Sequence, residues 1–188
     1  MRHDDMTRQG RWGLIQVYTG NGKGKTTAAL GTAIRAASVG RRVAIVAFDK
    51  GGEHYSEREI VRLRIPEIEF FPTGCDRIDP ATGAFRFGVT DEDRREGERA
   101  LGTAERLFAE ARHDMIVLDE VNSSTTLGIV DEASVLSLLD RKPPQVELIL
   151  TGRNAPPSFV DRADLVSDVM LVNHYFYRGE NAREGIDY

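Results

Sequence analysis

The sequence predicts an α/β protein in which a mainly parallel sheet of six strands lies between two layers of helices. Strand-like apolar runs recur along the 188 residues, and helical patterns separate them. Such alternation produces crossover units, and hence parallel strands with helices on both faces. A glycine-rich segment, residues 18–27, joins the first apolar run to the first helical pattern. A turn of this kind is typical of phosphate-binding P-loop proteins, whose ligands lie at the carboxyl ends of the strands.

The expected strands are short and rich in apolar or β-branched residues. They cover residues 14–18, 43–48, 68–71, 115–118, 146–150 and 169–172. Polar motifs follow directly after several of these runs, as expected for a site at one edge of a parallel sheet.

Five helices are expected between these strands. Helical patterns cover residues 25–39 (ending before Gly40), 55–63, 131–139 and a short stretch from about Pro156 to about Asp161. The longest helix begins at Thr90 or Asp91, either of which can cap it, and runs to about Ala111 with acids in its first turn. Residues 72–89 have no regular pattern and are too many for a simple connection, which favours a binding loop or lid.

Composition limits the classes of function. One domain is expected over residues 13–188, preceded by a flexible polar arm at residues 1–12. The net charge of −5 argues against a general nucleic-acid or anionic-membrane surface. The single cysteine, Cys75, excludes an intrachain disulfide and fits a reducing compartment. Neither a signal-peptide pattern nor an apolar run of transmembrane length is found, so we expect a cytoplasmic protein.

The glycine-rich segment contains the residue types that phosphate binding requires. Glycines let successive backbone N–H groups point inward and cradle phosphate oxygens. Lys25 then reaches the phosphates, and the Thr26 hydroxyl joins the coordination shell of a bound Mg²⁺. The usual motif has glycine where this chain has Thr19, with Gly20 next. The alternative interpretation is a glycine-rich turn that binds no ligand.

Two acids, Asp119 and Glu120, follow the apolar run at residues 115–118. In P-loop proteins an acid at this point binds Mg²⁺ directly or through water. Adjacent side chains on a strand point to opposite faces, so we expect the two acids to have different roles. The residues alone do not say which acid is the ligand, and a solvated strand end is the alternative.

Several further motifs occur in a fixed order along the chain. They are Val17-Tyr18-Thr19-Gly20-Asn21-Gly22-Lys23-Gly24-Lys25-Thr26-Thr27, Phe48-Asp49-Lys50-Gly51, Leu118-Asp119-Glu120-Val121-Asn122, Thr151-Gly152-Arg153-Asn154-Ala155-Pro156, Asn173-His174 and Gly185-Ile186-Asp187-Tyr188. With this set, residues 13–188 resemble the ATP:corrinoid adenosyltransferases of the cob(I)yrinic acid a,c-diamide type. A P-loop with threonine at its first position is that family's own form, so Thr19 supports the resemblance. The fold that it implies is a three-layer, RecA-like P-loop fold.

The resemblance implies transfer of the 5′-deoxyadenosyl group from ATP to Co(I) of a corrinoid, in the biosynthesis or salvage of adenosylcobalamin. Triphosphate leaves, and family members are understood to bind ATP reversed relative to ordinary P-loop enzymes, with the γ-phosphate deep in the loop. Tight binding of the triphosphate suits this chemistry, because negative charge develops on the triphosphate as it leaves. The resemblance also implies Mg²⁺ or Mn²⁺, a homodimer and a flavin-dependent reductase, with no nucleic-acid or membrane partner.

The resemblance assigns roles to individual residues. The triphosphate cradle would comprise Gly20, Asn21, Gly22, Lys23, Gly24, Lys25, Thr26 and Thr27. Thr26 and Glu120 would hold the metal, with Asp119 in support. Lys25, Thr26 and Glu120 would form the catalytic set.

Five residues outside the loop are further candidates. Arg153 would pair with a phosphate oxygen, and Lys50 would add charge near the nucleotide; a surface salt bridge and a solvated lysine are the alternatives. Asn122 and Asn154 would hydrogen-bond to nucleotide or corrinoid amides, or serve as turn residues. His174 is interpreted as a structural residue and not as a cobalt ligand.

One loop departs from the family. In the best-understood relatives, a Phe-x-Trp pattern follows a Thr-Gly pair. These aromatic side chains displace the lower axial ligand of cobalt(II), because cobalt(II) with that ligand resists reduction to cobalt(I). This chain has Thr73-Gly74-Cys75-Asp76-Arg77 there. Phe85 and Phe87 could replace them from the same loop, Cys75 could contact the corrinoid, or the chain has another substrate or no longer performs the reaction. We prefer the first, because Phe85 and Phe87 alternate with Arg86 as on one face of a strand, although they could instead pin the loop to the core.

Two other function classes stay open at this point. One is a P-loop ATPase or phosphotransferase with an unidentified acceptor, which would release ADP and phosphate. The other is a protein that binds nucleotide or corrinoid without turnover.

The tail is also more acidic than in relatives, with Glu180 and Glu184 beside Asn181, where relatives often have lysine. In relatives an N-terminal helix covers the partner subunit's corrinoid, and here only Trp12 could supply a large apolar contact.

Overall fold

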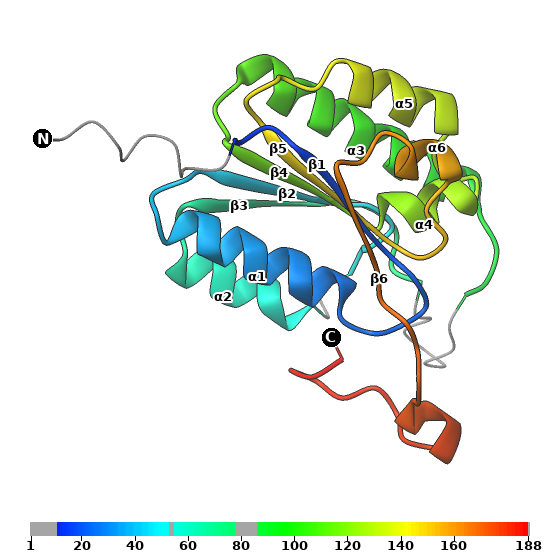
Figure 1. The fold of residues 1–188 in the computed structure, drawn as a ribbon. Coiled ribbons are helices and arrows are strands. Elements are labelled where there is room, and N and C mark those ends of the chain that lie inside the picture. Colours follow the sequence, from blue (N-terminus) through cyan, green and yellow to red (C-terminus); the bar gives the residue numbers. More distant parts are fainter. Residues whose placement is uncertain (1–10, 53–54, 78–85, 188) are drawn as a thin grey trace, which may run out of the picture.

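The computed structural model describes residues 11–52, 55–77 and 86–187 (Figure 1). Its strands are β1 (Ile15–Thr19), β2 (Val43–Ala47), β3 (Ile68–Pro72), β4 (Met115–Asp119), β5 (Glu147–Thr151) and β6 (Leu165–Asp168). Its helices are α1 (Lys25–Ala37), α2 (Ser56–Arg64), α3 (Asp91–Glu110), α4 (Val121–Thr126), α5 (Glu132–Asp140), α6 (Pro157–Val160) and the 3₁₀ helix η1 (Tyr175–Arg178). The first five predicted strands and all five predicted helices are present within two residues of the expected bounds.

The six strands form one sheet with the order β3-β2-β4-β5-β1-β6, and every neighbouring pair is parallel. Strand β5 therefore lies between β1, which precedes the glycine loop, and β4, which ends in Asp119. The predicted three-layer α/β fold is confirmed.

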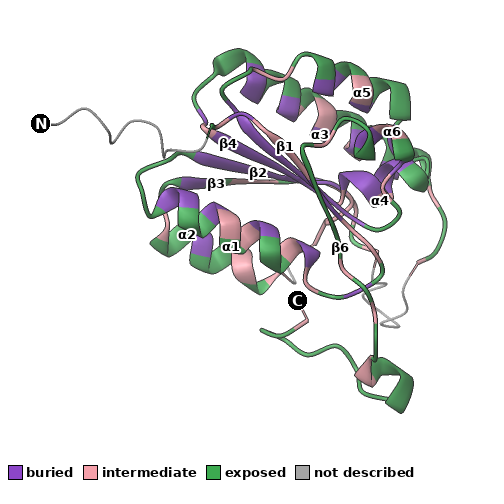
Figure 2. Ribbon diagram, in the orientation of Figure 1, coloured by how far each residue is buried: buried purple, intermediate pink, exposed green. Residues whose placement is uncertain are grey.

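The two faces of the sheet bury separate apolar clusters (Figure 2). Val43 and Ile45 of β2 pack with α1 and α2, whereas Ala44 and Val46 pack with α3 and α5, because side chains alternate along a strand. Helix α1 presents small residues such as Ala29 to the sheet, so it lies close to the strands. This close contact holds the first turn of α1 at the end of β1.

The sixth strand was predicted at the wrong place. It is Leu165–Asp168, not 169–172, and it is an edge strand that pairs only with β1 and whose residues are all exposed. Residues 169–172 leave the sheet, and Met170 and Val172 are exposed. The prediction chose residues 169–172 for their apolar content. An exposed edge strand does not need apolar residues, so this criterion missed β6.

Helix α4 and η1 were not predicted. Helix α4 consists largely of Ser and Thr, whose side chains favour caps and turns over helix interiors. Here their hydroxyls bond back to carbonyls one turn earlier, as in Thr125 Oγ1 to Val121 O at 2.8 Å. In the part of the chain that the structure describes, no helix combines the length and the apolar character needed to span a membrane.

Candidate active site

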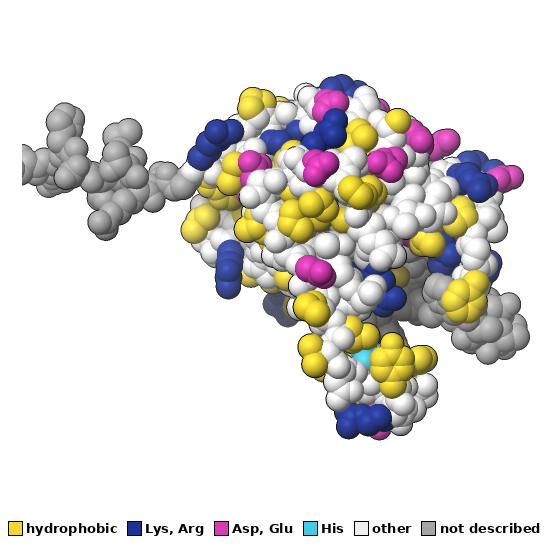
Figure 3. Space-filling view, turned by 45° about the vertical axis from the view of Figure 1, so that its right-hand side comes forward, with side chains coloured by type: hydrophobic (Ala, Val, Ile, Leu, Met, Phe, Trp, Pro, Cys, Tyr) yellow, Lys and Arg dark blue, Asp and Glu magenta, His cyan; other side chains and the backbone are white. Residues whose placement is uncertain are grey.

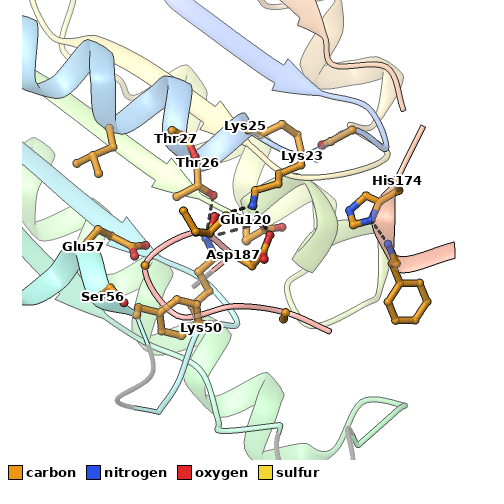
Figure 4. A pocket seen from close by; sticks show the side chains of 18 of the residues that line it. Lys23, Lys25, Thr26, Thr27, Lys50, Ser56, Glu57, Glu120, His174 and Asp187 are labelled. Atoms are coloured by element: carbon orange, nitrogen blue, oxygen red, sulfur yellow. Dashed lines mark hydrogen bonds and ion pairs between the residues drawn. The ribbon is translucent and has the colours of Figure 1, made fainter. Parts of the chain in front are cut away.

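The glycine loop and the ends of β2, β4 and β5 surround one cavity of about 680 Å³ (Figure 4). Its lining from the body of the domain includes Asn21, Gly22, Lys23, Gly24, Lys25, Thr26, Thr27, Lys50, Tyr55, Glu120 and Arg153. Most of the predicted cradle residues are therefore brought together, with Lys50, Glu120 and Arg153 opposite them. The site lies at the carboxyl edge of the parallel sheet, as predicted.

The glycines of the loop are required by its neighbours as well as by a ligand. Gly20 has φ +95°, and a Cβ there would lie 2.1 Å from Asp168 Oδ1. The Gly22 N–H donates to Val169 O at 2.6 Å, and a Cβ on Gly22 would lie 2.6 Å from the same oxygen. The chain after β6 thus packs directly against the loop. Thr19, at the first loop position, accepts a hydrogen bond on Oγ1 from Ala155 N at 3.0 Å.

Lys25 is held inside the loop. Its side-chain ammonium donates to Gly20 O and Gly22 O, both at 2.8 Å, and the residue is only 6% exposed. Burial lowers the pKa of Lys25, because desolvation disfavours the charged form. A bound polyphosphate would restore the lost solvation of this ammonium.

Thr26, Asp119 and Lys50 form a cluster beneath the loop. Thr26 Oγ1 donates to Asp119 Oδ1 at 3.0 Å, and Lys50 Nζ lies 2.8 Å from Thr26 Oγ1 and 2.5 Å from Asp119 Oδ2. Thr151 Oγ1 donates to Asp119 Oδ1 at 2.5 Å. Burial alone would lower the pKa of Lys50, but the negative charges of Asp119 and Glu120 outweigh it and raise the pKa. The cluster is therefore built around a positive charge.

This donor set fits a divalent cation. Hydroxyl and carboxylate oxygens are the ligands that Mg²⁺ prefers, and it keeps only one or two carboxylates when phosphates complete its shell. The Lys50 ammonium already occupies a cationic position between Thr26 and Asp119. Glu120 lies slightly further out, with Oε1 3.9 Å from Lys50 Nζ. Among the described residues, no group of three or more His, Cys, Asp or Glu side chains is arranged to hold a metal ion. A metal at this site would therefore need hydroxyl, phosphate or water oxygens as further ligands.

Glu120 and Asp119 differ in environment, but not through the expected alternation along a strand, because β4 ends at Asp119. Asp119 is 1% exposed and fully engaged by neighbours. Glu120 has φ +63°, begins α4 and lines the cavity, and its carboxylate accepts a hydrogen bond from Ser123 Oγ. Its N–H donates to Thr151 Oγ1 at 3.0 Å. Glu120 is the acid that faces the cavity, and Asp119 is the acid that contacts the Thr26 hydroxyl.

Asn122 and Asn154, which were predicted as site residues, do not line the cavity. Asn122 is fully buried, and its Nδ2 donates to Tyr18 O at 3.4 Å and Gly152 O at 3.3 Å, so it links the ends of β1 and β5. Asn154 has φ +53°, and its carbonyl accepts from Thr126 Oγ1 at 2.7 Å. For Asn154 the structure agrees with the turn role that was left open, whereas Asn122 lies in α4 and bonds to backbone carbonyls instead. Arg153, next to Asn154 in the chain, does line the cavity.

The loop after β3 is held by charged side chains. Arg77 Nε donates to Asp49 Oδ1 at 2.8 Å, and Arg86 makes two hydrogen bonds of 2.7 and 2.9 Å to the buried Asp93. Burial and then a hydrogen bond to Asp93 raise the pKa of the Cys75 thiol to about 11, so this cysteine is protonated at neutral pH. Phe87 is 86% exposed and does not line the cavity, and Phe85 lies outside the described residues.

The sequence interpretation missed one wall of the cavity. Tyr175, Ile186 and Asp187 line it from the C-terminal segment, and Lys23 bonds to all three. Local patterns contain no signal for a contact across more than 150 residues, although Gly185–Tyr188 was noted as a family motif. His174 accepts a hydrogen bond on Nδ1 from Phe176 N at 3.1 Å and so caps η1, which agrees with its interpretation as a structural residue.

A glycine loop with a buried lysine, a threonine beside a strand-end acid and further cations around one cavity define a P-loop nucleotide-binding protein. The particular family follows from comparison with known proteins. The family model of the ATP:corrinoid adenosyltransferases BtuR/CobO/CobP matches residues 11–188. The chain therefore belongs to this family, and it is an enzyme that transfers the adenosyl group of ATP to a corrinoid.

Curated relatives agree with this assignment. The corrinoid adenosyltransferase of Escherichia coli K12 is 35% identical over 181 residues, which are 94% of this chain and 86% of that protein. The corrinoid adenosyltransferase CobA of Salmonella typhimurium has the same identity and coverage. A corrinoid adenosyltransferase of a Sinorhizobium species is 33% identical over 97% of this chain and 83% of its own length.

Proposed function

We propose that the loop at residues 20–27 binds the triphosphate of ATP as a leaving group, while C5′ of the ribose faces the corrinoid. The observation that carries this proposal is the gathering of cations in one cavity. Lys23, Lys25, Lys50 and Arg153 line it from the loop and the strand ends together with Glu120, while the other acids of the lining, Glu57, Glu180 and Asp187, come from α2 and the C-terminal segment. Such a site stabilises negative charge that develops on the departing triphosphate.

The reaction proposed for this site is a displacement at carbon. The electron pair of Co(I) attacks C5′, a cobalt–carbon bond forms, and the C5′–O bond breaks with its electrons going to the triphosphate. Lys25 is the cation closest to the loop backbone and would contact the phosphate deepest in the cradle. Arg153 also lines the cavity and would pair with a second phosphate oxygen. The catalytic set is Lys25, Thr26 and Glu120.

Mg²⁺, or Mn²⁺ in its place, is proposed as the metal of this site. Thr26, Asp119 and Glu120 would hold it, directly or through water. When bound, the metal would neutralise charge on the triphosphate. Lys50 would move away from Asp119 or share the carboxylate with the metal, since its ammonium occupies the position between Thr26 and Asp119.

We propose that the corrinoid binds beside the loop after β3. Phe85 and Phe87 would displace the lower axial ligand of cobalt(II), and the ion pairs of Arg77 and Arg86 would hold the loop that carries them. The support is that Phe87 is exposed and Cys75 is protonated, which leaves the aromatic side chains as the candidates for this role.

The remaining proposals concern the assembly. We propose that residues 13–188 form one domain with residues 1–12 as a flexible arm, and that the chain acts as a cytoplasmic homodimer supplied with electrons by a flavin-dependent reductase. The exposed edge strand β6 and the exposed Met170 and Val172 that follow it support a protein interface. Light scattering of the purified protein tests this, and a monomer at micromolar concentration would contradict the homodimer.

The chemistry is tested by identifying the products. The protein, ATP, Mg²⁺ and a chemically reduced corrinoid should give a light-sensitive alkylcobalt product and one equivalent of inorganic triphosphate. Release of ADP and phosphate would contradict the proposed displacement at C5′ and favour phosphoryl transfer. ATP binding without any product would favour a binding protein.

A further inference from the structure

The C-terminal segment, residues 174–187, folds back onto the glycine loop and forms one wall of the nucleotide cavity (Figure 4). The wall consists of His174, Tyr175, Phe176, Glu180, Ala182, Gly185, Ile186 and Asp187. The segment projects from the body of the domain as a lobe with several hydrophobic side chains on its surface (Figure 3). It follows β6, so it reaches the loop from the edge of the sheet.

Lys23 is the residue of the loop that the segment contacts. Its Nζ lies 3.1 Å from Tyr175 Oη and 2.5 Å from Ile186 O, and it forms an ion pair with Asp187. An ammonium group has three N–H donors, so these three acceptors engage all of them. Lys23 therefore connects the loop to the segment.

Asp187 is where these contacts meet. Besides Lys23, its carboxylate accepts hydrogen bonds from Tyr175 Oη and from Arg183 N, the latter at 3.0 Å. Its side chain is only 12% exposed. Hydrogen bonds from Lys23 and then from Tyr175 hold the pKa of Asp187 well below its usual range, so the carboxylate is charged at neutral pH. The Arg183 guanidinium lies 4.6 Å from the centre of the Tyr175 ring, and its Nε also donates to Asp187 Oδ2, so Arg183 contacts both residues.

Apolar burial contributes little to the attachment of this segment. Helix η1 contains no buried residue, and Phe176 and Ile186 are 66% and 60% exposed. The polar contacts of Lys23 and Asp187 are therefore the main connection between the wall and the loop in the described part of the segment.

We propose that Asp187 is a positioning residue of the nucleotide site: it fixes Lys23 over the loop and holds the C-terminal wall in place. With the wall closed, the cavity of about 680 Å³ is within the range of small-ligand sites, so ATP fits without displacing the segment. Lys23 exchanges its hydrogen bond to Tyr175 Oη for one to a phosphate oxygen and keeps its ion pair with Asp187. This inference rests on the proposed binding of triphosphate by the loop.

The test compares two variants that remove the same charge from the same segment. Asp187→Asn should raise the Kd for inorganic triphosphate and the KM for ATP by about tenfold, with kcat within about twofold, because the contact positions a binding group. Glu184→Gln is the matched control, since Glu184 is exposed and lies outside the cavity lining, and it should change neither constant. Asp187→Glu should restore part of the affinity, which a packing role would not explain.

A double-mutant cycle shows whether Asp187 acts through Lys23. Lys23→Met should weaken triphosphate binding, and adding Asp187→Asn should weaken it little further. An unchanged Kd in Asp187→Asn would overturn the inference, and so would tighter binding, which would mean that the carboxylate competes with phosphate. Calorimetry with triphosphate needs no corrinoid, so it tests the inference even if adenosyl transfer fails. Absent binding by the unmodified protein would instead refute the proposed function.

Discussion

The nucleotide cavity and the loop after β3, beside which we propose that the corrinoid binds, are the two sides of the proposed active site, and they are built in different ways. On the nucleotide side, the loop at residues 20–27 and Asp119 are fixed by the ends of buried strands, and Lys25 and Asp119 are 6% and 1% exposed. On the side of the loop after β3, Phe87 lies at the surface, and ion pairs of Arg77 with Asp49 and of Arg86 with Asp93 hold the chain. The first side has the local P-loop pattern, whereas the second has Cys75, Asp76 and Arg77 where the family resemblance implies aromatic residues.

This difference teaches where variation is tolerated. A change on the nucleotide side alters backbone geometry that several strands depend on, because a Cβ at Gly20 or Gly22 would meet the chain after β6. A change at an exposed side chain of the loop after β3, such as Phe87, removes little buried surface, and loops accept substitution more readily than strands do. We therefore expect the largest effects of mutation on the first side and smaller, more selective effects on the second.

The largest effect is expected from Lys25→Ala. The variant loses the buried ammonium that faces the loop carbonyls, and kcat/KM for ATP should fall by about 10²–10³, the usual cost of losing one preorganised charge at a reacting centre. Steady-state kinetics and triphosphate calorimetry measure this. The melting temperature should stay within a few degrees of the unmodified protein, and a large fall in it would mean that the lysine is structural.

Thr26→Val should have the next largest effect. The substitution keeps the shape of the side chain but removes the hydroxyl that contacts Asp119 and Lys50. We expect the Mg²⁺ concentration for half-maximal activity to rise by about tenfold or more, as for loss of a group that supports a metal. Thr26→Ser keeps the hydroxyl and is the matched control. Equal metal dependence in both variants would exclude Thr26 from the metal site.

The nucleotide side was largely predictable from sequence, and particular residues explain why. Gly20, Gly24, Lys25 and Thr26 are neighbours in the chain, so one local pattern specifies the cradle. Asp119 was found because it ends a clearly apolar strand. Their meeting in space follows from the parallel sheet, which brings the carboxyl ends of its strands to one edge.

The rest of the site depends on contacts that no local pattern encodes. Lys23 meets Asp187 from 164 residues away, and Arg77 meets Asp49 across 28 residues. Exposed β6 lacks the apolar run by which strands are recognised. Asn122 was expected to reach a ligand, but its position at the start of α4 turns it toward the backbone of β1 and β5. In each case tertiary contacts decide the role of the residue.

Asp93→Asn tests the ion pairs of the second side. The variant keeps the side-chain shape but loses the charge that Arg86 contacts, so we expect the melting temperature to fall by roughly 5 °C. Hydrogen bonds from Arg86, together with those from Thr90, lower the pKa of Asp93. A carboxylate whose pKa is lowered by folding contributes its full stabilisation at a pH above its unfolded pKa of about 3.9. This stabilisation is lost as the pH falls from that value through the pKa of the folded state.

The pH dependence separates this contact from simple packing. The melting temperature of the unmodified protein should fall more steeply below about pH 4 than that of Asp93→Asn, since only the former has a carboxylate to protonate. Differential scanning calorimetry from pH 3 to 7 measures both curves. Parallel curves would show that the charge of Asp93 does not stabilise the loop after β3.

The smallest and most selective effect is expected from Phe87→Ala. Phe87 is 86% exposed, so the substitution should leave the melting temperature and the KM for ATP unchanged. If Phe87 displaces the axial ligand, the rate from a cobalt(II) corrinoid and a reductase should fall several-fold, whereas the rate from a chemically reduced Co(I) corrinoid should not change. We expect the same of Phe85→Ala. The two starting oxidation states are matched controls for each other, because they use the same protein and the same nucleotide site. An equal loss from both would place Phe87 in general corrinoid binding, and no loss from either would assign axial-ligand displacement to another part of the loop after β3.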